Sequence, residues 1–307
     1  MTDLLSILAD QTGVNPLDLI RLSSTAPRRY KVFHIKKRSG GLREIAQPAP
    51  EVKIVQRAIN TSILRHLPVH EAAKAYRPKT SILDNARSHA GGYPLLKMDF
   101  KDFFPSIKAR DWIAYCTSHA LLSRAEVDFT CQFLFRKPKG ERDLRLSIGA
   151  PSSPSLSNIL MYDFDVIVSD AALSKGISYS RYADDLTFSG QRIGMLKDML
   201  GVVSRATRDV HWPRLTLNDD KTSFVSMASK RFVTGVVLAN DGALGIGRDR
   251  RRAISAKVHR AKVGKLEQDE VASLRGELAY VNVVEPTFLD WLVRKYGEDV
   301  IYLIKRG

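Results

Sequence analysis

The chain has 307 residues, 44% of them hydrophobic, which is enough to bury a sizeable core as one large domain or as two to three subdomains. Lysine and arginine number 48 against 33 acidic residues, and this net charge of +15 favours a nucleic acid partner over a membrane surface, because no membrane-span-length apolar run, basic amphipathic terminus or lipidation motif is present. Two cysteines and no signal peptide exclude a disulfide framework and predict a cytoplasmic protein.

The first predicted elements surround a basic hairpin. Helices are predicted over residues 3–9, 16–22 and 51–66, and strands over 30–35 and 42–46. The turn between the strands is Ser39-Gly40-Gly41, and the basic side chains near it are Lys36, Lys37, Arg38 and Arg43. Such a cluster of charges is either a solvated face or a contact for the phosphates of a nucleotide or template.

The next informative segment begins with an apolar strand at Leu95. This strand presents Asp99 at its end, where a strand next to an active site would offer a metal ligand, although a helix-capping aspartate is the alternative. Helices are predicted over 110–135, followed by a basic loop over 136–145. Gly149-Ala150-Pro151 then forms a turn that opens a helix, and its backbone can approach a substrate closely while the helix N-terminus favours anionic groups.

Asp184 and Asp185 are adjacent carboxylates between two short apolar and aromatic runs. The flanking residues, such as Tyr179 and Phe188, suit strands, so the pair is predicted at the tip of a hairpin. Two neighbouring carboxylates repel each other and normally need a cation, and hard oxygen ligands of this kind suit Mg²⁺. An ordinary Asp-Asp turn is the alternative, because turns favour aspartate.

The C-terminal third is basic. A helix is predicted over 194–209, a strand over 215–222 runs into a turn with Lys221, and residues 232–242 form a hairpin. The helix beyond carries Arg248, Arg250, Arg251, Arg252, Lys257, Arg260, Lys262 and Lys265, against Asp249 and Glu267. This stripe suits the backbone of a nucleic acid, and a helical tail follows it.

The order of these features resembles that of a reverse transcriptase. A strand-end aspartate, a Gly-Ala-Pro turn, the Tyr182-Ala183-Asp184-Asp185 hairpin and an Asn-x-x-Lys-Thr segment follow one another, and the similarity extends over about residues 28–300. The resemblance implies an α+β right-hand polymerase fold with fingers, palm and helical thumb, and the activity of an RNA-directed DNA polymerase. It also implies that Asp99, Asp184 and Asp185 are the catalytic palm carboxylates that bind two Mg²⁺ ions.

Further matches concern the nucleotide. The residues at nucleotide-binding positions of the family are Lys37 (or Lys36), Arg43, Phe104, Gly149, Ala150 and Lys221. The basic members match residues that hold the triphosphate or lie near the pyrophosphate. Phe104 matches the bulky residue that blocks a nucleotide 2′-hydroxyl, which implies deoxynucleoside triphosphates as substrates. The family usually has Gln before the glycine, where this chain has Ile148, so no side-chain hydrogen bond to the nucleotide is expected there.

Two short motifs resemble the retron branch of the family. Asn85-Ala86-Arg87-Ser88-His89 matches its Asn-Ala-x-x-His motif, and Val233-Thr234-Gly235 matches its Val-Thr-Gly motif, although a lone histidine such as His89 is more often structural. The residues predicted to contact RNA or DNA are Asn85, His89, Val233, Thr234, Gly235, Arg248, Arg250, Arg251, Arg252, Lys257 and Arg260.

This resemblance implies a bacterial enzyme that copies part of its own structured noncoding RNA. Priming from a guanosine 2′-hydroxyl would give branched multicopy single-stranded DNA, an RNA–DNA hybrid used in anti-phage defence with a separate effector protein. The alternatives are a reverse transcriptase of group II intron descent or of another defence system, and an RNA-binding scaffold that restrains an effector. The complete carboxylate set argues against scaffolding alone. The predicted domains are an N-terminal helical segment (1–27), fingers and palm (28–235) and a thumb (236–307).

Overall fold

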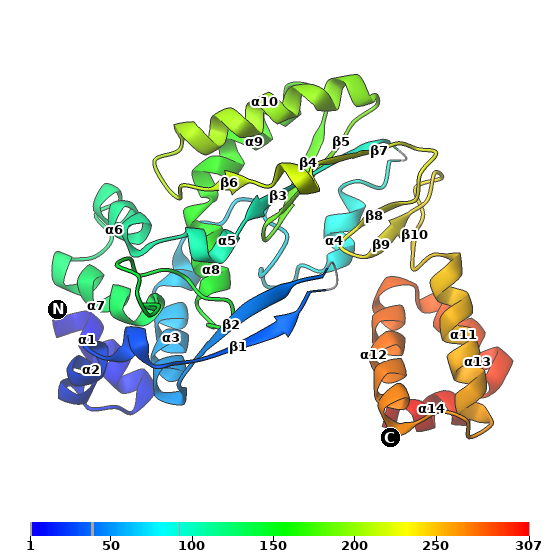
Figure 1. The fold of residues 1–307 in the computed structure, drawn as a ribbon, viewed down its shortest axis with the longest axis horizontal. Helices are drawn as coiled ribbons and strands as arrows, with labels where there is room; N and C mark the ends of the chain where they lie inside the picture. Colours follow the sequence, from blue (N-terminus) through cyan, green and yellow to red (C-terminus); the bar gives the residue numbers. More distant parts are fainter. Residues whose placement is uncertain (1, 38–39, 92, 307) are drawn as a thin grey trace.

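The computed structural model describes residues 2–37, 40–91 and 93–306. Mixed helices and sheets form a main body with a separate helical lobe at the C-terminal end (Figure 1). Arg38 and Ser39, predicted at the tip of the basic hairpin, lie outside the described residues. None of the helices in the described part of the chain is both long and apolar enough to cross a membrane.

The N-terminal part combines a small helical base with a projecting hairpin (Figure 1). Its elements are α1 (Thr2–Thr12), α2 (Pro16–Ser23), the 3₁₀ helix η1 (Ala26–Arg28), β1 (Tyr30–Lys36), β2 (Leu42–Pro48), α3 (Pro50–Ser62) and η2 (Leu64–His66). The Asn15 side chain accepts a hydrogen bond from the Leu17 amide and so caps α2, as its sequence pattern predicts. β1 and β2 are antiparallel, which confirms the predicted hairpin.

The palm is built on an antiparallel sheet of five strands. These are β3 (Leu95–Lys101), β4 (Ser178–Tyr182), β5 (Asp185–Ser189), β6 (Thr216–Leu217) and β7 (Ser223–Val225), in the order β4-β5-β3-β6 with β7 also paired to β3. The surrounding helices are α4 (Ile82–Arg87), α5 (Phe103–Ser106), α6 (Ala109–Ser118), α7 (Arg124–Leu134), α8 (Ser153–Leu160), α9 (Tyr162–Leu173), α10 (Ile193–Asp209) and η3 (Asp219–Lys221).

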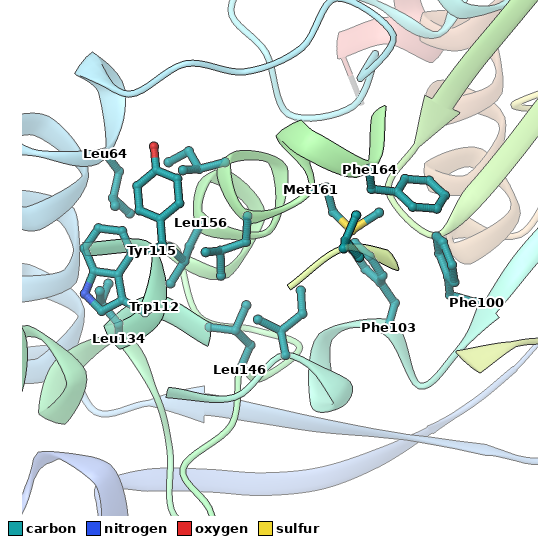
Figure 2. Close-up of a cluster of buried hydrophobic side chains, with 14 of the residues drawn as sticks. Leu64, Phe100, Phe103, Trp112, Tyr115, Leu134, Leu146, Leu156, Met161 and Phe164 are labelled. Carbon is teal, nitrogen blue, oxygen red and sulfur yellow. The ribbon is translucent and has the colours of Figure 1, made fainter. Parts of the chain in front are cut away.

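One large hydrophobic core joins the N-terminal helices to the palm. Phe100 at the end of β3 packs edge-on against Phe164 of α9, with ring centroids 5.5 Å apart, and the cluster continues through Met161 to Trp112 and Tyr115 (Figure 2). Leu4, Leu8 and Leu19 belong to the same core. The helical segment predicted over 1–27 therefore packs as part of the main body.

The second core lies mainly in the thumb and also includes Ala86 of α4 and Leu95 of β3. Its elements are β8 (Arg231–Val233), β9 (Val236–Leu238), β10 (Leu244–Gly245), α11 (Arg248–Lys262), α12 (Gln268–Val284), α13 (Pro286–Tyr296) and α14 (Glu298–Arg306). Val233 and Val236, on the two strands of the β8–β9 hairpin, are both buried in this core. The boundary predicted between residues 235 and 236 falls within the turn of this hairpin and stays a prediction.

Candidate active site

The three predicted carboxylates meet at one end of the palm sheet. Tyr182 pairs with Asp185 across the β4–β5 hairpin, so Ala183 and Asp184 form its two-residue turn, with Ala183 in the left-handed region at φ 58°. Asp99 on β3 lies directly opposite Asp185 on β5. The Phe100 amide also donates to the Asp184 carbonyl oxygen at 3.3 Å, which ties the turn to β3.

Mutual repulsion shapes the electrostatics of this group. Partial burial, followed by the charge of Asp99, raises the pKa of Asp184. Burial, and then the charges of Asp184 and Asp99, raise the pKa of Asp185 to about 7. Lys221 Nζ donates to Asp99 Oδ2 at 2.8 Å, and this bond raises the pKa of Lys221 although burial alone would lower it. A cluster with this much negative charge is stabilised by added cations.

The chemistry of the donor set fits a hard divalent cation. Carboxylate oxygens are the ligands that Mg²⁺ prefers, and Lys221 already supplies one positive charge to Asp99. Among the residues that the structure describes, no three Asp, Glu, His or Cys side chains are drawn together as a closed metal-ligand group. The strand pairings place the carboxylates side by side, but their role as metal ligands stays a prediction.

The raised pKa of Asp185 predicts a pH-dependent stability. Between the ordinary aspartate pKa and about 7, the folded protein holds a proton that the unfolded chain has released, so in metal-free buffer stability falls as pH rises through this window. Asp185→Asn removes the repulsion and should raise the melting temperature at pH 8 but not at pH 4. Because Asp185 is partly exposed, solvent screening keeps the gain below about 1 kcal/mol. Melting curves in EDTA that were equally pH-dependent in both proteins would contradict this.

A cleft of about 770 Å³ opens beside the carboxylates. Its lining includes Asp99, Asp184, Lys37, Arg43, Phe104, Lys221 and Ile148. It thus gathers side chains from the β1–β2 hairpin, the end of β3, the palm turn and η3. Four of the predicted nucleotide-binding residues are among them, facing two of the carboxylates.

Gly149 and Ala150 directly follow Ile148, which lines this cleft, and their contact with a nucleotide stays a prediction. Gly149 has a φ of +119°, and a Cβ there would lie 3.0 Å from the Ala46 carbonyl oxygen. The Ala46 amide donates to the Ile148 carbonyl oxygen at 2.8 Å. The glycine therefore permits close packing of the turn on β2, and this contact connects the hairpin of the fingers to the palm.

A buried ion pair lies under the turn formed by Ala183 and Asp184, and sequence reasoning did not single it out. Arg181 and Asp165 are both fully buried, with Arg181 Nη2 2.6 Å from Asp165 Oδ2. Arg181 Nη1 also donates to the Ala183 carbonyl oxygen at 3.2 Å and to Asn158 Oδ1 at 3.1 Å, while the Tyr179 hydroxyl donates to Asp165. This network fixes the left-handed residue that precedes Asp184. An arginine next to the turn motif was the available signal, but its partner lies 16 residues away.

Asn85 and His89 are buried under the palm hairpin. The ring nitrogens of His89 lie 2.8 Å from Ser180 Oγ and 2.7 Å from Ser189 Oγ, and Ser180 donates to Asn85 Oδ1. Both residues are only 1% exposed, which argues against direct contact with RNA or DNA, and that contact stays a prediction.

The Val-Thr-Gly motif forms the turn of the β8–β9 hairpin. Thr234 and Gly235 have φ values of 48° and 82°, as tight hairpin turns require, and Val233 is buried. Thr234 Oγ1 donates to the Ile82 carbonyl oxygen of α4, and the Tyr280 hydroxyl of α12 donates to the Gly235 carbonyl oxygen. The motif therefore joins palm to thumb, and contact of its residues with RNA or DNA stays a prediction.

The basic helix α11 uses part of its charge within the thumb. Arg251 pairs with Glu285, and its guanidinium also lies over the Phe288 ring. Lys257 pairs with Glu277, Arg260 with Glu270, and Arg250 stacks on Tyr280 at 4.1 Å. Several of the basic side chains predicted to contact a phosphate backbone therefore pair with side chains of the thumb, and these contacts help to hold α11 against α12. Arg248 and Arg252 are exposed, and the charge of Arg252 helps to lower the pKa of Asp249 after the bond from Lys230.

Comparison with known proteins decides the family. A profile of the family "Reverse transcriptase (RNA-dependent DNA polymerase)" matches residues 35–259. The Retron Ec83 reverse transcriptase of Escherichia coli is 39% identical over 94% of this chain and 93% of its own. The chain is a retron-type reverse transcriptase. The Retron Ec86 reverse transcriptase of Escherichia coli is 30% identical over 95% of this chain and 90% of its own.

Solved structures agree on the fold of this reverse transcriptase. A telomerase from Candida albicans in complex with a fragment of telomeric RNA superposes with a TM-score of 0.51 at 12% identity, over 93% of this chain and 58% of that one. The retron-type chain therefore has the right-hand polymerase fold, as predicted, and is an RNA-directed DNA polymerase. It acts on an RNA template and on DNA. The roles of individual site residues stay predictions.

Proposed function

We propose that this reverse transcriptase copies part of its own structured noncoding RNA into branched, multicopy single-stranded DNA, primed from a guanosine 2′-hydroxyl. The observation that carries the proposal is its similarity to the Retron Ec83 reverse transcriptase along 94% of the chain. The match covers 94% of this chain and 93% of that relative. We further propose a role in anti-phage defence with a separate effector protein.

In this proposal Asp99, Asp184 and Asp185 hold two Mg²⁺ ions. When bound, such ions lower the pKa of the attacking hydroxyl and stabilise the departing pyrophosphate. Lys37 and Arg43, which line the cleft from the fingers, bind the triphosphate as fixed positive charges. The carboxylates on one wall and the basic side chains on another leave space between them for a nucleotide.

Two other cleft residues have distinct roles in the proposal. Phe104 packs against Phe103 and Tyr76 at ring distances of 5.3 and 6.3 Å, so its ring is held in place to exclude a nucleotide 2′-hydroxyl. Lys221 would move from Asp99 toward the pyrophosphate once cations neutralise the carboxylates. Its present bond to Asp99 keeps the Lys221 ammonium beside the carboxylates in the lining of the cleft.

The thumb supplies the surface for the RNA and its hybrid product. A groove of about 720 Å³ between α11 and α13 is lined by Arg251, Arg252, His259, Glu285, Phe288, Trp291, Arg294, Lys295 and others. Aromatic rings beside basic side chains suit stacked bases and phosphates. Glu285 is the acidic side chain in this lining, and its charge is already matched by Arg251.

Arg252 and Arg260 provide a matched test of this surface. Arg252→Ala should lower the affinity for the cognate RNA and reduce its salt slope by about 1, because one phosphate contact is lost. Arg260→Ala should change the slope less, since its guanidinium is held by Glu270. Filter binding from 50 to 300 mM salt would measure both. Identical slopes in wild type and Arg252→Ala would show that this part of α11 faces solvent.

The main experiment is to express the chain with its upstream noncoding region and to separate total nucleic acid on a denaturing gel. We expect a short DNA that survives ribonuclease, shifts on treatment with a debranching enzyme, and is absent in Asp184→Asn. Activity on an added primer and template without such a DNA would instead favour an intron-like or other defence-linked enzyme. RNA binding without any synthesis would favour a scaffold.

A further inference from the structure

The buried cluster under the palm hairpin has a defined arrangement of hydrogens. Ser180 has one hydroxyl hydrogen, and it is donated to Asn85 Oδ1 at 2.6 Å. Its oxygen must therefore accept from His89 Nε2, which leaves His89 Nδ1 to accept from the Ser189 hydroxyl. Ser180 both donates and accepts in this chain of bonds, and the imidazole needs only one ring hydrogen, as in its neutral form. Burial accordingly lowers the pKa of His89 to about 3.

This cluster holds the same face of the hairpin that carries a catalytic carboxylate. Side chains alternate along a strand, so Ser180 and Tyr182 of β4 share one face. Their partners across the hairpin are Thr187 and Asp185, which lie on that face too. The bond of His89 to Ser180 therefore lies two residues along β4 from Tyr182, which pairs with Asp185 at the turn.

Helix α4, which carries Asn85 and precedes His89, also contacts the thumb hairpin. Asn85 belongs to α4, and His89 follows two residues after the helix ends. At the start of α4, the Ile82 carbonyl oxygen accepts from Thr234 Oγ1 in the β8–β9 turn. The turn is in turn bound by Tyr280 of α12. One short segment, residues 82–89, thus contacts the catalytic hairpin at one end and the thumb at the other.

We infer that Asn85 and His89 are positioning residues, which fix the β4–β5 hairpin on α4 so that Asp185 stays opposite Asp99. The inference rests on the proposed assignment of the carboxylates to catalysis. Because the imidazole joins Ser180 on one strand to Ser189 on the other, it resists both sliding of the strands and lifting of the hairpin. A buried network with every member bonded is well suited to hold one geometry.

The test uses the full chain with its RNA and measures single-nucleotide incorporation. Ser180→Ala and Ser189→Ala each remove one hydroxyl and leave His89 in place. We expect the rate at saturating nucleotide to fall about tenfold and the Mg²⁺ concentration for half-maximal rate to rise, because losing a buried hydrogen bond loosens the hairpin. The KM for nucleotide should change little, since the other wall of the cleft is intact.

Thr130→Val is the matched control. Thr130 lies on α7, in the main-body core away from the palm hairpin. Its equally buried hydroxyl accepts a hydrogen bond from the Trp112 indole N–H at 3.1 Å, and the substitution removes this hydroxyl. It should lower thermal stability to a similar extent while leaving the rate and the Mg²⁺ requirement unchanged. His89→Gln, which keeps one donor and one acceptor, should retain more activity than His89→Ala.

The outcomes separate the two proposals. Serine variants that match Thr130→Val in rate and in Mg²⁺ requirement, at equal folded fraction, would reduce the cluster to an ordinary part of the core and overturn the inference. In that case an inactive Asp184→Asn would leave the catalytic assignment standing. An active Asp184→Asn would overturn the catalytic assignment itself. If His89→Ala does not fold, the two serine variants decide the matter.

Discussion

Asp184→Asn is expected to reduce DNA synthesis on the order of 10³-fold or more, because removing a metal-binding charge costs several kcal/mol of transition-state stabilisation. The change is nearly isosteric, and Asp184 sits in a two-residue turn held by Arg181 and by the Phe100 amide. The fold and the affinity for RNA should therefore be retained. Primer extension and RNA binding on the same preparation would measure both.

Asp220→Asn is the control for this result. Asp220 lines the same cleft and is exposed, so the variant makes the same change in charge without touching the carboxylate cluster. Its rate should stay close to that of the wild type. Synthesis by Asp184→Asn within tenfold of the wild type would contradict the assignment of the site. Equal losses in Asp184→Asn and Asp220→Asn would mean that the total negative charge of the cleft, and not the position of Asp184, determines the rate.

The carboxylates could be predicted from sequence because local patterns place them. The apolar run before Asp99 and the aromatic runs around Asp184 and Asp185 define strands, and antiparallel strands of one sheet present their ends together. The same holds for the basic hairpin of the fingers. Its alternation and its turn residues determine β1 and β2, which the structure confirms.

Contacts over long sequence separations could not be predicted in this way. His89 reaches Ser189, 100 residues away, and Gly149 packs on Ala46, so neither role is visible in the residues around them. The sequence pattern of the His89 motif gave no sign that this side chain is buried, because its burial depends on the fold. The charges of α11 show the same limit, since Glu270 and Glu285 neutralise part of the stripe from other elements.

Asp165→Ala is expected to lower the free energy of unfolding by about 3–5 kcal/mol, because it leaves the guanidinium of Arg181 buried without its counter-charge. Both side chains are fully buried, so water cannot replace the lost carboxylate. Urea unfolding followed by circular dichroism would measure the loss. Asp198→Ala is the matched control, since it breaks an exposed pair with Lys175 and should cost less than about 1 kcal/mol.

The double variant Asp165→Leu/Arg181→Met distinguishes stability from function at this site. Replacing both charges by apolar side chains removes the unpaired charge and should restore most of the stability lost in Asp165→Ala. It also removes the guanidinium that holds the Ala183 carbonyl oxygen, so DNA synthesis should stay well below the wild-type rate. A double variant that regained both stability and synthesis would mean that the ion pair serves the core alone. Recovered stability with impaired synthesis would mean that the buried arginine is retained to hold the left-handed turn from which Asp184 projects.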